Sequence, residues 1–260
     1  MSHDVSPPPL YGAVPPYAAF QPVDPASLMS GRVPLPPGSV LALKVDAGAR
    51  VSEVEEMIRQ WVPALRVRHP AVPVVLWVAM DARAVLPLLL RAATLGVSGA
   101  VAEDDAVAAG LRESLASPFR VGAGVVEGLR LRRWRVPARA GTLVEQLVDG
   151  SAEHAELGPL LHRLREPGGA VCSYLRNHRL PAARDWFQLG RALHAVLALQ
   201  REPDRPVQEV ARGLRYSEAA SLSRQLQQVF GARPTCVRSL LGWEWLLDRW
   251  AARVQGARSA

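Results

Sequence analysis

Between residues 40 and 115, short apolar runs alternate with segments whose apolar residues recur at helical spacing. The runs are typical of buried strands, and the segments between them are typical of helices that bury one face. Strands are predicted at 40–45, 73–78 and 99–101, and helices at 51–67, 83–95 and 105–115. A regular alternation of strand and helix predicts a parallel sheet with helices packed on it. We therefore expect an α/β domain over residues 38–118.

A proline-rich segment precedes this domain. Within residues 1–37, the prolines lie at positions 7, 8, 9, 15, 16, 22, 25, 34, 36 and 37. Proline has no backbone N–H, so it interrupts the hydrogen bonding of helices and of central strands. Residues 1–37 are therefore predicted to form a disordered or extended tail.

A basic segment follows the α/β domain at residues 119–150. Trp134 lies within a run of arginines, and prolines and glycines interrupt any regular pattern; the arginines are Arg130, Arg132, Arg133, Arg135 and Arg139. This segment is predicted to be a linker. Its basic run either follows a DNA backbone or is simply solvated, and the sequence leaves both interpretations open.

Residues 151–260 show helical spacing, and their first part predicts two short helices. Ser151 is expected to be the N-cap of the first helix, residues 166–169 its turn, and His178 the end of the second. The apolar positions of the two helices are Leu157, Leu160, Leu161, Leu164, Val171, Tyr174 and Leu175. After a break at Leu180-Pro181, a joining helix is predicted over 186–200.

A second pair of helices follows the joining helix. The first, from Val207, ends in the segment 213–217, and Ser217 is expected to cap the second, which ends before Gly231 and Pro234. The buried face of this second helix is predicted to hold Leu222, Leu226, Val229 and Phe230. Beyond Arg238 the chain is expected to continue as a very apolar helix, which either completes the core or forms a dimer contact; the core is the favoured interpretation.

Two short helices joined by a tight turn are typical of a helix-turn-helix motif. The second helix of such a motif enters the major groove of DNA when its exposed N-terminal half carries no bulky side chain. The outer residues of the predicted helix satisfy this condition: they are Glu218, Ala219, Ala220, Ser223, Arg224 and Gln227. The motif is therefore a candidate DNA-binding element.

The stretch from Val207 to Arg238 resembles the second helix-turn-helix of the AraC/XylS family of transcription regulators. The shared features are the alanine in the first helix, the Leu-x-Tyr-Ser turn, the Leu-Ser-Arg centre, the Phe-Gly pair and the following proline. The resemblance implies that Ala219, Ala220, Ser223 and Arg224 match base-facing positions and that Gln227 can reach a phosphate. Arg215 departs from the family, which usually has glycine in the turn. We expect Arg215 to adopt a positive φ at some strain, with a side chain that could also reach phosphate.

Because this family carries two such motifs joined by a long helix, the pair starting at Ser151 matches the first motif. Here Pro167-Gly168-Gly169 replaces the usual polar start of the recognition helix. Cys172, Ser173 and Arg176 remain on the outer side. The first motif is therefore expected to contact phosphate or to make no DNA contact, with Ser173 and Arg176 as its candidate residues.

Residues 40–115 resemble the second half of a response-regulator receiver domain, with His69-Pro70 before the central strand and the segment 92–99 after it. Such domains hold Mg²⁺ and a phosphoacceptor aspartate in an acidic pocket. Asp46 lies near the acceptor position, but the other carboxylates, the hydroxyl residue and the lysine of the pattern are missing. Phosphorylation is therefore not expected, because nothing would stabilise an acyl phosphate. Asp46 is predicted to be a turn or cap residue.

The charge distribution adds to this interpretation. The net charge of +7 arises after residue 119: residues 1–119 hold nine Lys and Arg against eleven Asp and Glu, whereas residues 120–260 hold twenty-two against thirteen. A basic domain is what neutralisation of DNA phosphates requires. All the cations except Lys44 are arginines, which also fits a general compositional bias toward arginine. Charge alone therefore does not decide between DNA binding and such a bias.

The remaining chemistry-bearing residues are sparse. The six histidines do not have metal-ligand spacing, and no phosphate-binding glycine loop or GxSxG motif is present. Cys172 and Cys236 are too few for a disulfide framework and are predicted to be reduced packing residues. No apolar run spans a bilayer and no secretory signal is visible, so a cytoplasmic protein without metal or cofactor is expected.

The sequence thus predicts an α/β plus all-α protein: a truncated receiver-like parallel sheet with helices over 38–118, then an all-helical AraC-type double helix-turn-helix domain over 151–260. The predicted function is sequence-specific binding of double-stranded DNA in transcription regulation, without enzymatic activity. The N-terminal domain is expected to contact RNA polymerase or a second copy of the chain. The alternative is a non-enzymatic adaptor protein with a degenerate helix-turn-helix domain.

Overall fold

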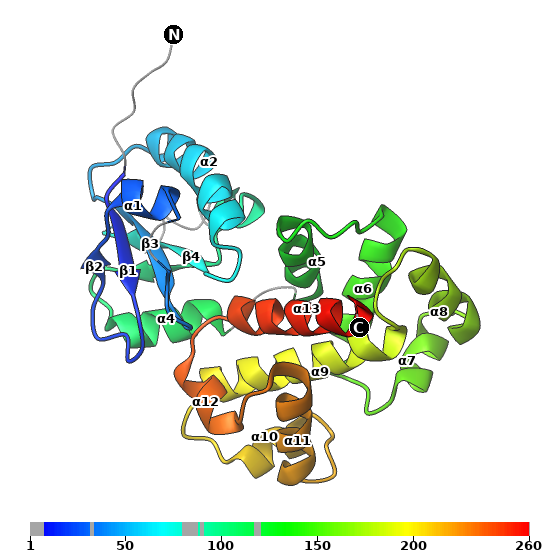
Figure 1. The fold of residues 1–260 in the computed structure, drawn as a ribbon. Helices are drawn as coiled ribbons and strands as arrows, with labels where there is room; N and C mark the ends of the chain where they lie inside the picture. Colours follow the sequence, from blue (N-terminus) through cyan, green and yellow to red (C-terminus); the bar gives the residue numbers. More distant parts are fainter. Residues whose placement is uncertain (1–7, 32–33, 80–87, 89–90, 117–120, 260) are drawn as a thin grey trace. The chain divides into compact units, whose positions relative to one another are not determined.

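The computed structural model describes residues 8–31, 34–79, 88, 91–116 and 121–259 (Figure 1). The chain divides into two compact units. The first unit contains the chain up to Ala116 together with Ser239–Trp245, and the second contains the chain between Ala116 and Ser239 together with the residues after Trp245. The first unit combines strands with helices, and the described part of the second is helical. A mixed α/β class, as expected, is confirmed.

The first unit is built on a five-stranded sheet with the strand order β2-β1-β3-β4-β5. β3 (Val40–Val45), β4 (Val74–Val78) and β5 (Gly99–Ala102) are parallel to one another, as the alternation predicted. β1 (Leu10–Ala13) runs antiparallel to β3, and the short β2 (Gln21–Pro22) runs antiparallel to β1. The sheet is therefore mixed, and the prediction of a purely parallel sheet is wrong.

Both faces of the sheet are covered, because successive side chains of a strand point to opposite faces. Leu41 and Leu43 of β3 belong to the core cluster that includes α2 (Val51–Arg68). Val40 and Ala42 belong to the cluster that includes Leu111 and Leu115, two residues of α4 (Val107–Leu115). The continuous apolar sequence of β3 thus results from burial on two sides.

The proline-rich segment is not a disordered tail in its described part. β1 contains no proline, so its N–H groups can pair with β3, and Pro22 lies on the edge strand, where no ladder partner is required. Pro25 occupies the first turn of α1 (Pro25–Met29), where its missing N–H costs nothing, and the Asp24 carboxylate accepts hydrogen bonds from Ala26 N and Ser27 N. Residues 1–7 and 32–33 of the expected tail lie outside the described residues.

The helix expected over 83–95 falls largely outside the described residues. Leu88 and residues 91–94 are helical, while 80–87 and 89–90 are among the residues not described. Leu88 and Ala92 are buried in the cluster beneath α2. The described residues of this segment are therefore helical, and they bury Leu88 and Ala92 on the α2 face of the sheet.

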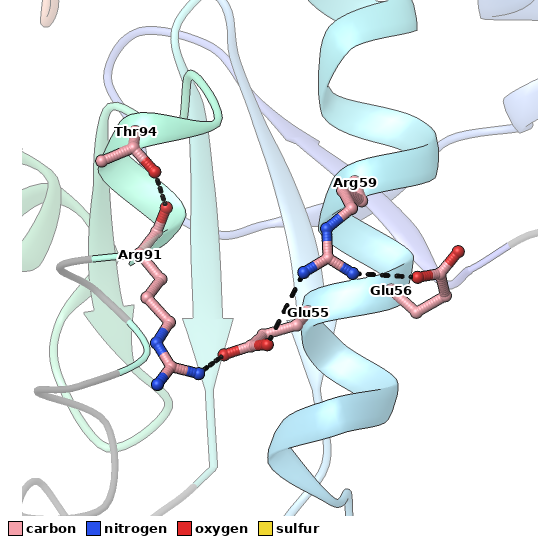
Figure 2. A network of polar contacts seen from close by, with 5 residues as sticks. All are labelled: Glu55, Glu56, Arg59, Arg91 and Thr94. Atoms are coloured by element: carbon pink, nitrogen blue, oxygen red, sulfur yellow. Dashed lines mark hydrogen bonds and ion pairs between the residues drawn. The ribbon is translucent and has the colours of Figure 1, made fainter.

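A polar network joins this segment to α2 (Figure 2). The Arg91 guanidinium donates to Glu55 Oε1 at 2.5 Å, and Arg59 pairs with Glu56 at 3.1 Å. Thr94 Oγ1 donates to the backbone oxygen of Arg91 at 2.7 Å. Since the arginines are exposed, each ion pair contributes about 0–1 kcal/mol and mainly orients the segment.

Residues 239–245, which we call the strap, belong to the first unit although they run from the last residue of one helix to the second residue of the next, and the rest of both helices belongs to the second unit. Leu241 is buried in the cluster on the α4 face, and its N–H donates to the Tyr17 hydroxyl at 2.8 Å. The same hydroxyl donates to Gly38 O at 2.7 Å, and Trp245 Nε1 donates to Ser39 O at 3.3 Å. The strap therefore completes the core of the α/β unit.

Tyr17 gives this arrangement a measurable pH dependence. Burial raises the pKa of Tyr17 to about 12, although the hydrogen bond from Leu241 lowers it in part. The folded state thus keeps a proton that the unfolded state loses near pH 10, so stability falls as pH rises from about 10 to 12, by about 1.4 kcal/mol per pH unit. Urea titrations of the wild type between pH 9 and 12 should show this loss. Tyr17→Phe should show a shallower slope, and an unchanged slope would contradict the assignment.

The second unit begins with α5 (Val121–Leu131) and α6 (Ala138–Gly150), so residues 121–131 and 138–150 are not a linker. Their apolar residues recur at helical spacing and are buried, whereas Arg130 and Arg139 are exposed. The arginines lie between these two helices and on their exposed faces, so they do not interrupt the apolar spacing. Residues 132–137 form the connection between the two helices.

The two expected helix pairs and the joining helix are present. Figure 1 shows the two pairs on different sides of the long helix α9. The bounds are α7 (Leu157–Arg163), α8 (Gly168–Asn177), α9 (Ala183–Arg201), α10 (Val207–Gly213), α11 (Ala219–Phe230), α12 (Pro234–Ser239) and α13 (Glu244–Ser259).

α9 is the centre of the helical unit and is buried along most of its length. Trp186 is fully buried and packs at 4.9 Å between ring centroids against Trp250 of α13. At Gly190, α6 approaches so closely that an added Cβ would lie 2.6 Å from Val148 O. Glycine at this position therefore permits the crossing of α6 and α9.

Several predicted helix ends differ from the structure. Ser151 does not cap α7: it is the C-cap residue of α6, and its hydroxyl donates to Val148 O at 2.7 Å. The N-cap of α11 is Glu218 rather than Ser217. The glycines expected in the turn, Gly168 and Gly169, form the first turn of α8 instead.

The continuous apolar helix expected after Arg238 is also wrong, because the chain breaks between α12 and α13. Gly242 has a φ of 86°, which ends helical geometry and lets the strap enter the first unit. The preference for core burial is confirmed for Leu241, Leu246 and Trp250.

Candidate nucleic-acid interface

The second helix pair, which we call motif 2, has a tight turn with a defined hydrogen-bond pattern. Arg215 N donates to Arg212 O at 3.0 Å, and Tyr216 N donates to Ala211 O at 2.9 Å. This pattern is a Schellman motif at the end of α10, in which the residue directly after the C-cap adopts the left-handed conformation. That residue is Arg215, whose φ of 58° confirms the prediction of a positive φ. The side chain replaces the usual glycine at a cost of about 1 kcal/mol.

A side chain of α10 satisfies the start of α11. Gln208 Oε1 accepts a hydrogen bond from Ala219 N at 3.1 Å, and so replaces the capping contact expected from Ser217. Helix N-termini leave unpaired N–H groups that favour such acceptors. The contact fixes α11 against α10, and sequence reasoning missed it because the acceptor lies in the preceding helix.

The predicted outer residues of α11 do share one face. Leu222, Leu226, Val229 and Phe230 are buried on the opposite side, as predicted. Among the candidate DNA-contacting residues, Glu218, Ala220, Arg224 and Gln227 are exposed, and Ala219 and Ser223 are half-buried. Small side chains thus flank Arg224.

Two of these candidates have internal partners. The Arg224 guanidinium lies 3.3 Å from Glu218 Oε1 and 3.2 Å from Ser221 Oγ. Ser223 Oγ donates to Ala219 O at 2.9 Å, so its proton is engaged with the backbone while its lone pairs stay available. Arg224 is therefore held along the outer face by an exposed carboxylate.

The first helix pair, motif 1, repeats the turn of motif 2. Arg165 has a φ of 55°, with Arg165 N donating to His162 O at 3.0 Å and Glu166 N donating to Leu161 O at 3.1 Å. Both turns therefore carry an arginine at the left-handed position. The Leu-Arg pair at 164–165 matches the Leu-Arg pair at 214–215, and this repeat in the sequence indicates that the two turns are alike.

The outer face of α8 carries little base-reading chemistry. Cys172 and Arg176 are exposed and Ser173 is half-buried, while Val171 and Leu175 are buried on the other side. The Arg176 guanidinium lies 3.5 Å from Ser173 Oγ, at the limit of a hydrogen bond. No carboxylate among the described residues forms an ion pair with Arg176, so its charge is available to an external anion.

A buried arginine of α9, Arg191, contacts the turn of motif 2 and the loop that precedes motif 1, and it was not among the predicted residues. Its guanidinium donates to His154 O at 2.6 Å and to Leu214 O at 3.0 Å. It also lies 4.2 Å from the ring centroid of Tyr216. Burial raises the pKa of Tyr216, and the neighbouring Arg191 charge lowers it in part.

In the α/β unit, the edge of the sheet where a receiver would hold its phosphoacceptor carries an ion pair. Lys44 Nζ lies 3.0 Å from Glu103 Oε1 and 3.9 Å from Asp46 Oδ1. The hydrogen bond with Glu103 is the main cause of the raised pKa of Lys44. Asp46 lies in a turn, where its backbone oxygen accepts from Ala49 N at 3.0 Å. Its turn placement agrees with the prediction.

The described residues offer neither a metal site nor a membrane-spanning helix. Within the described ranges, no three or more His, Cys, Asp and Glu residues are grouped so that they could hold a metal ion. Over the same ranges, no helix combines the length and apolar character needed to cross a membrane. Cys172 and Cys236 form no disulfide with each other, in agreement with the prediction that they are reduced, but both are exposed, so the prediction that they are packing residues is wrong.

Neither a protein-family model nor a curated protein matches this chain.

Proposed function

We propose that this chain is a sequence-specific DNA-binding transcription regulator of the AraC/XylS type, acting in the cytoplasm without enzymatic or phosphoacceptor activity. The observation that carries the proposal is the outer face of α11, where the small residues Ala219, Ala220 and Ser223 precede Arg224 on a helix anchored by a tight turn. A helix of this kind fits the major groove, and an arginine there can bind guanine through two hydrogen bonds. The α/β unit supplies the contact with RNA polymerase or with a second copy of the chain.

The pairing of Arg224 with Glu218 is compatible with this role on energetic grounds. Both side chains are exposed, at 70% and 58%, so the ion pair contributes at most about 1 kcal/mol. A bidentate contact with guanine is worth about 1–3 kcal/mol of discrimination. Binding to DNA can therefore replace the internal pair, and Glu218 disfavours positions where its carboxylate would meet a phosphate.

A second candidate function is that of a non-enzymatic adaptor protein. Two observations favour it: α8 begins with Gly168 and Gly169 where base-reading side chains would lie, and Glu218 neutralises Arg224. A gel-shift titration of the full chain against random duplex DNA, at several salt concentrations, separates the two functions. Salt-dependent binding followed by enrichment of one sequence in a selection supports the regulator, and absence of any shift supports the adaptor.

The two motifs are expected to contribute differently to binding. Arg224→Ala should lower affinity for the selected site by roughly 5- to 150-fold, corresponding to about 1–3 kcal/mol, and leave binding to random DNA nearly unchanged. Arg176→Ala should weaken binding to all sequences alike and reduce the slope of log K against log salt by about one, because it removes a phosphate contact. Both variants are to be compared with the wild type on selected and random duplexes.

The reverse pattern would refute these roles. Should Arg176→Ala abolish sequence preference while Arg224→Ala binds both duplexes like the wild type, the functions of the two helices are exchanged. Should neither substitution change binding, the adaptor function is favoured.

A further inference from the structure

Arg191 is a buried cation in the middle of the helix that joins the two motifs. The residue is 7% exposed, and its contacts among the described residues are backbone carbonyls and aromatic rings, none of them a carboxylate. A buried charge without a counter-ion is costly unless hydrogen bonds satisfy it. An apolar residue could occupy this buried position of α9 without the cost of burying a charge. The two hydrogen bonds to carbonyl groups are therefore what an arginine contributes here.

One of these contacts holds the turn of motif 2. Leu214 O, at 3.0 Å from Arg191 Nη2, is the backbone oxygen that directly precedes the left-handed Arg215. The ring of Tyr216, in the same turn, stacks on the guanidinium at 4.2 Å. Since α11 starts three residues further on, Arg191 sets where the recognition helix begins relative to α9.

The other contact holds the entry to motif 1. His154 O, at 2.6 Å from Arg191 Nη1, lies in the loop before α7. That loop is tied to α7 by an ion pair between Glu153 and Arg163, which is the main cause of the lowered pKa of Glu153. The carbonyl that Arg191 reaches therefore belongs to a loop that is itself held against α7.

From this geometry we propose that Arg191 fixes the separation of the two helix-turn-helix motifs and thereby the spacing between the DNA segments that they contact. The planar guanidinium carries two donor groups in a rigid fork, and this fork spans the two carbonyl groups. A lysine has one compact ammonium group and cannot reproduce the span. Arg191 is thus a positioning residue: it acts through the motifs and does not itself touch DNA.

The inference rests on the proposed DNA-binding function and is tested with the full chain on DNA. A selected site is altered by inserting one, two or three base pairs between the segments protected by motif 1 and motif 2 in a hydroxyl-radical footprint. A fixed separation predicts that the wild type loses about tenfold in affinity or more for a shifted spacing, because two linked contacts reinforce each other strongly only when both engage. Equal affinity for all spacings would overturn the inference while leaving DNA binding in place.

Substitutions of Arg191 test whether this residue causes the preference for one spacing. Arg191→Met and Arg191→Lys should keep the base preference set by Arg224 but tolerate the inserted base pairs, with the motif 1 footprint weakened or spread. Arg184→Met, an exposed arginine of the same helix, is the matched control and should behave like the wild type. Circular dichroism and urea unfolding identify which Arg191 variant is folded, and the wild-type spacing series still tests the inference if neither is.

The possible results separate the role of Arg191 from the proposed DNA-binding function of the chain. A folded Arg191 variant with the wild-type spacing preference overturns the role of Arg191, although the protein remains a DNA-binding protein. A wild-type footprint confined to motif 2 overturns it as well. A wild type that binds no DNA overturns the proposed function and this inference together.

Discussion

Replacing Glu244 with alanine should lower the free energy of unfolding of the α/β unit by about 3–5 kcal/mol, because it leaves a buried guanidinium without its counter-charge. The Glu244 and Arg66 side chains are 7% and 10% exposed and approach to 3.7 Å. Ser98 Oγ also donates to Glu244 Oε1 at 3.1 Å. Urea unfolding of the full chain, followed by tryptophan fluorescence, measures the change.

A double substitution separates the charge from the packing. Arg66→Met together with Glu244→Met removes both charges and keeps most of the volume, so it should recover much of the stability lost in Glu244→Ala. If the double variant is as unstable as Glu244→Ala, or if Glu244→Ala is neutral, the ion pair does not anchor the strap.

Gly190→Ala should destabilise the helical unit by about 1–3 kcal/mol, even though alanine normally favours a helix over glycine by about 1 kcal/mol. The added Cβ would lie 2.6 Å from the backbone oxygen of Val148, which cannot move without displacing α6. Overpacking against backbone therefore outweighs helix propensity at this position. The expected result is a lower midpoint in urea with an unchanged m-value.

Gly256→Ala provides the matched control. Gly256 lies in α13 and has no heavy atom within 4 Å of an added Cβ, so alanine there should be neutral or stabilising. A gain in stability from Gly190→Ala would show that α6 and α9 do not cross as closely as described.

Local patterns predicted the local structure well. The parallel strands β3, β4 and β5 and the motif 2 helices follow from the spacing of apolar residues, and the positive φ of Arg215 follows from the resemblance of this turn to one that usually carries glycine. The same approach failed where a partner far along the chain decides. β1 is a strand because β3 pairs with it, and the many prolines around β1 predicted an irregular segment instead.

In the candidate site, too, local features were predicted and features that depend on a distant partner were not. The outer face of α11 was predicted correctly in its exposure, because the buried positions of a helix determine the opposite side. Gln208 and Arg191 were missed, since each acts on a backbone group 11 or more residues away in sequence. No periodicity or motif indicates which buried arginine will meet two carbonyl groups.

The strap also dictates the order in which the protein can be finished during synthesis. Residues up to Ala116 leave the ribosome first, but their core lacks Leu241, Glu244 and Trp245 until the strap emerges. At the usual rate of about 5–20 residues per second, the interval between Ala116 and Trp245 is roughly 6–26 seconds. The α/β unit, although its strands are made first, is therefore completed only after most of the helical unit has been made, and a nascent chain halted within the helical unit should expose an unfinished apolar surface on its N-terminal half.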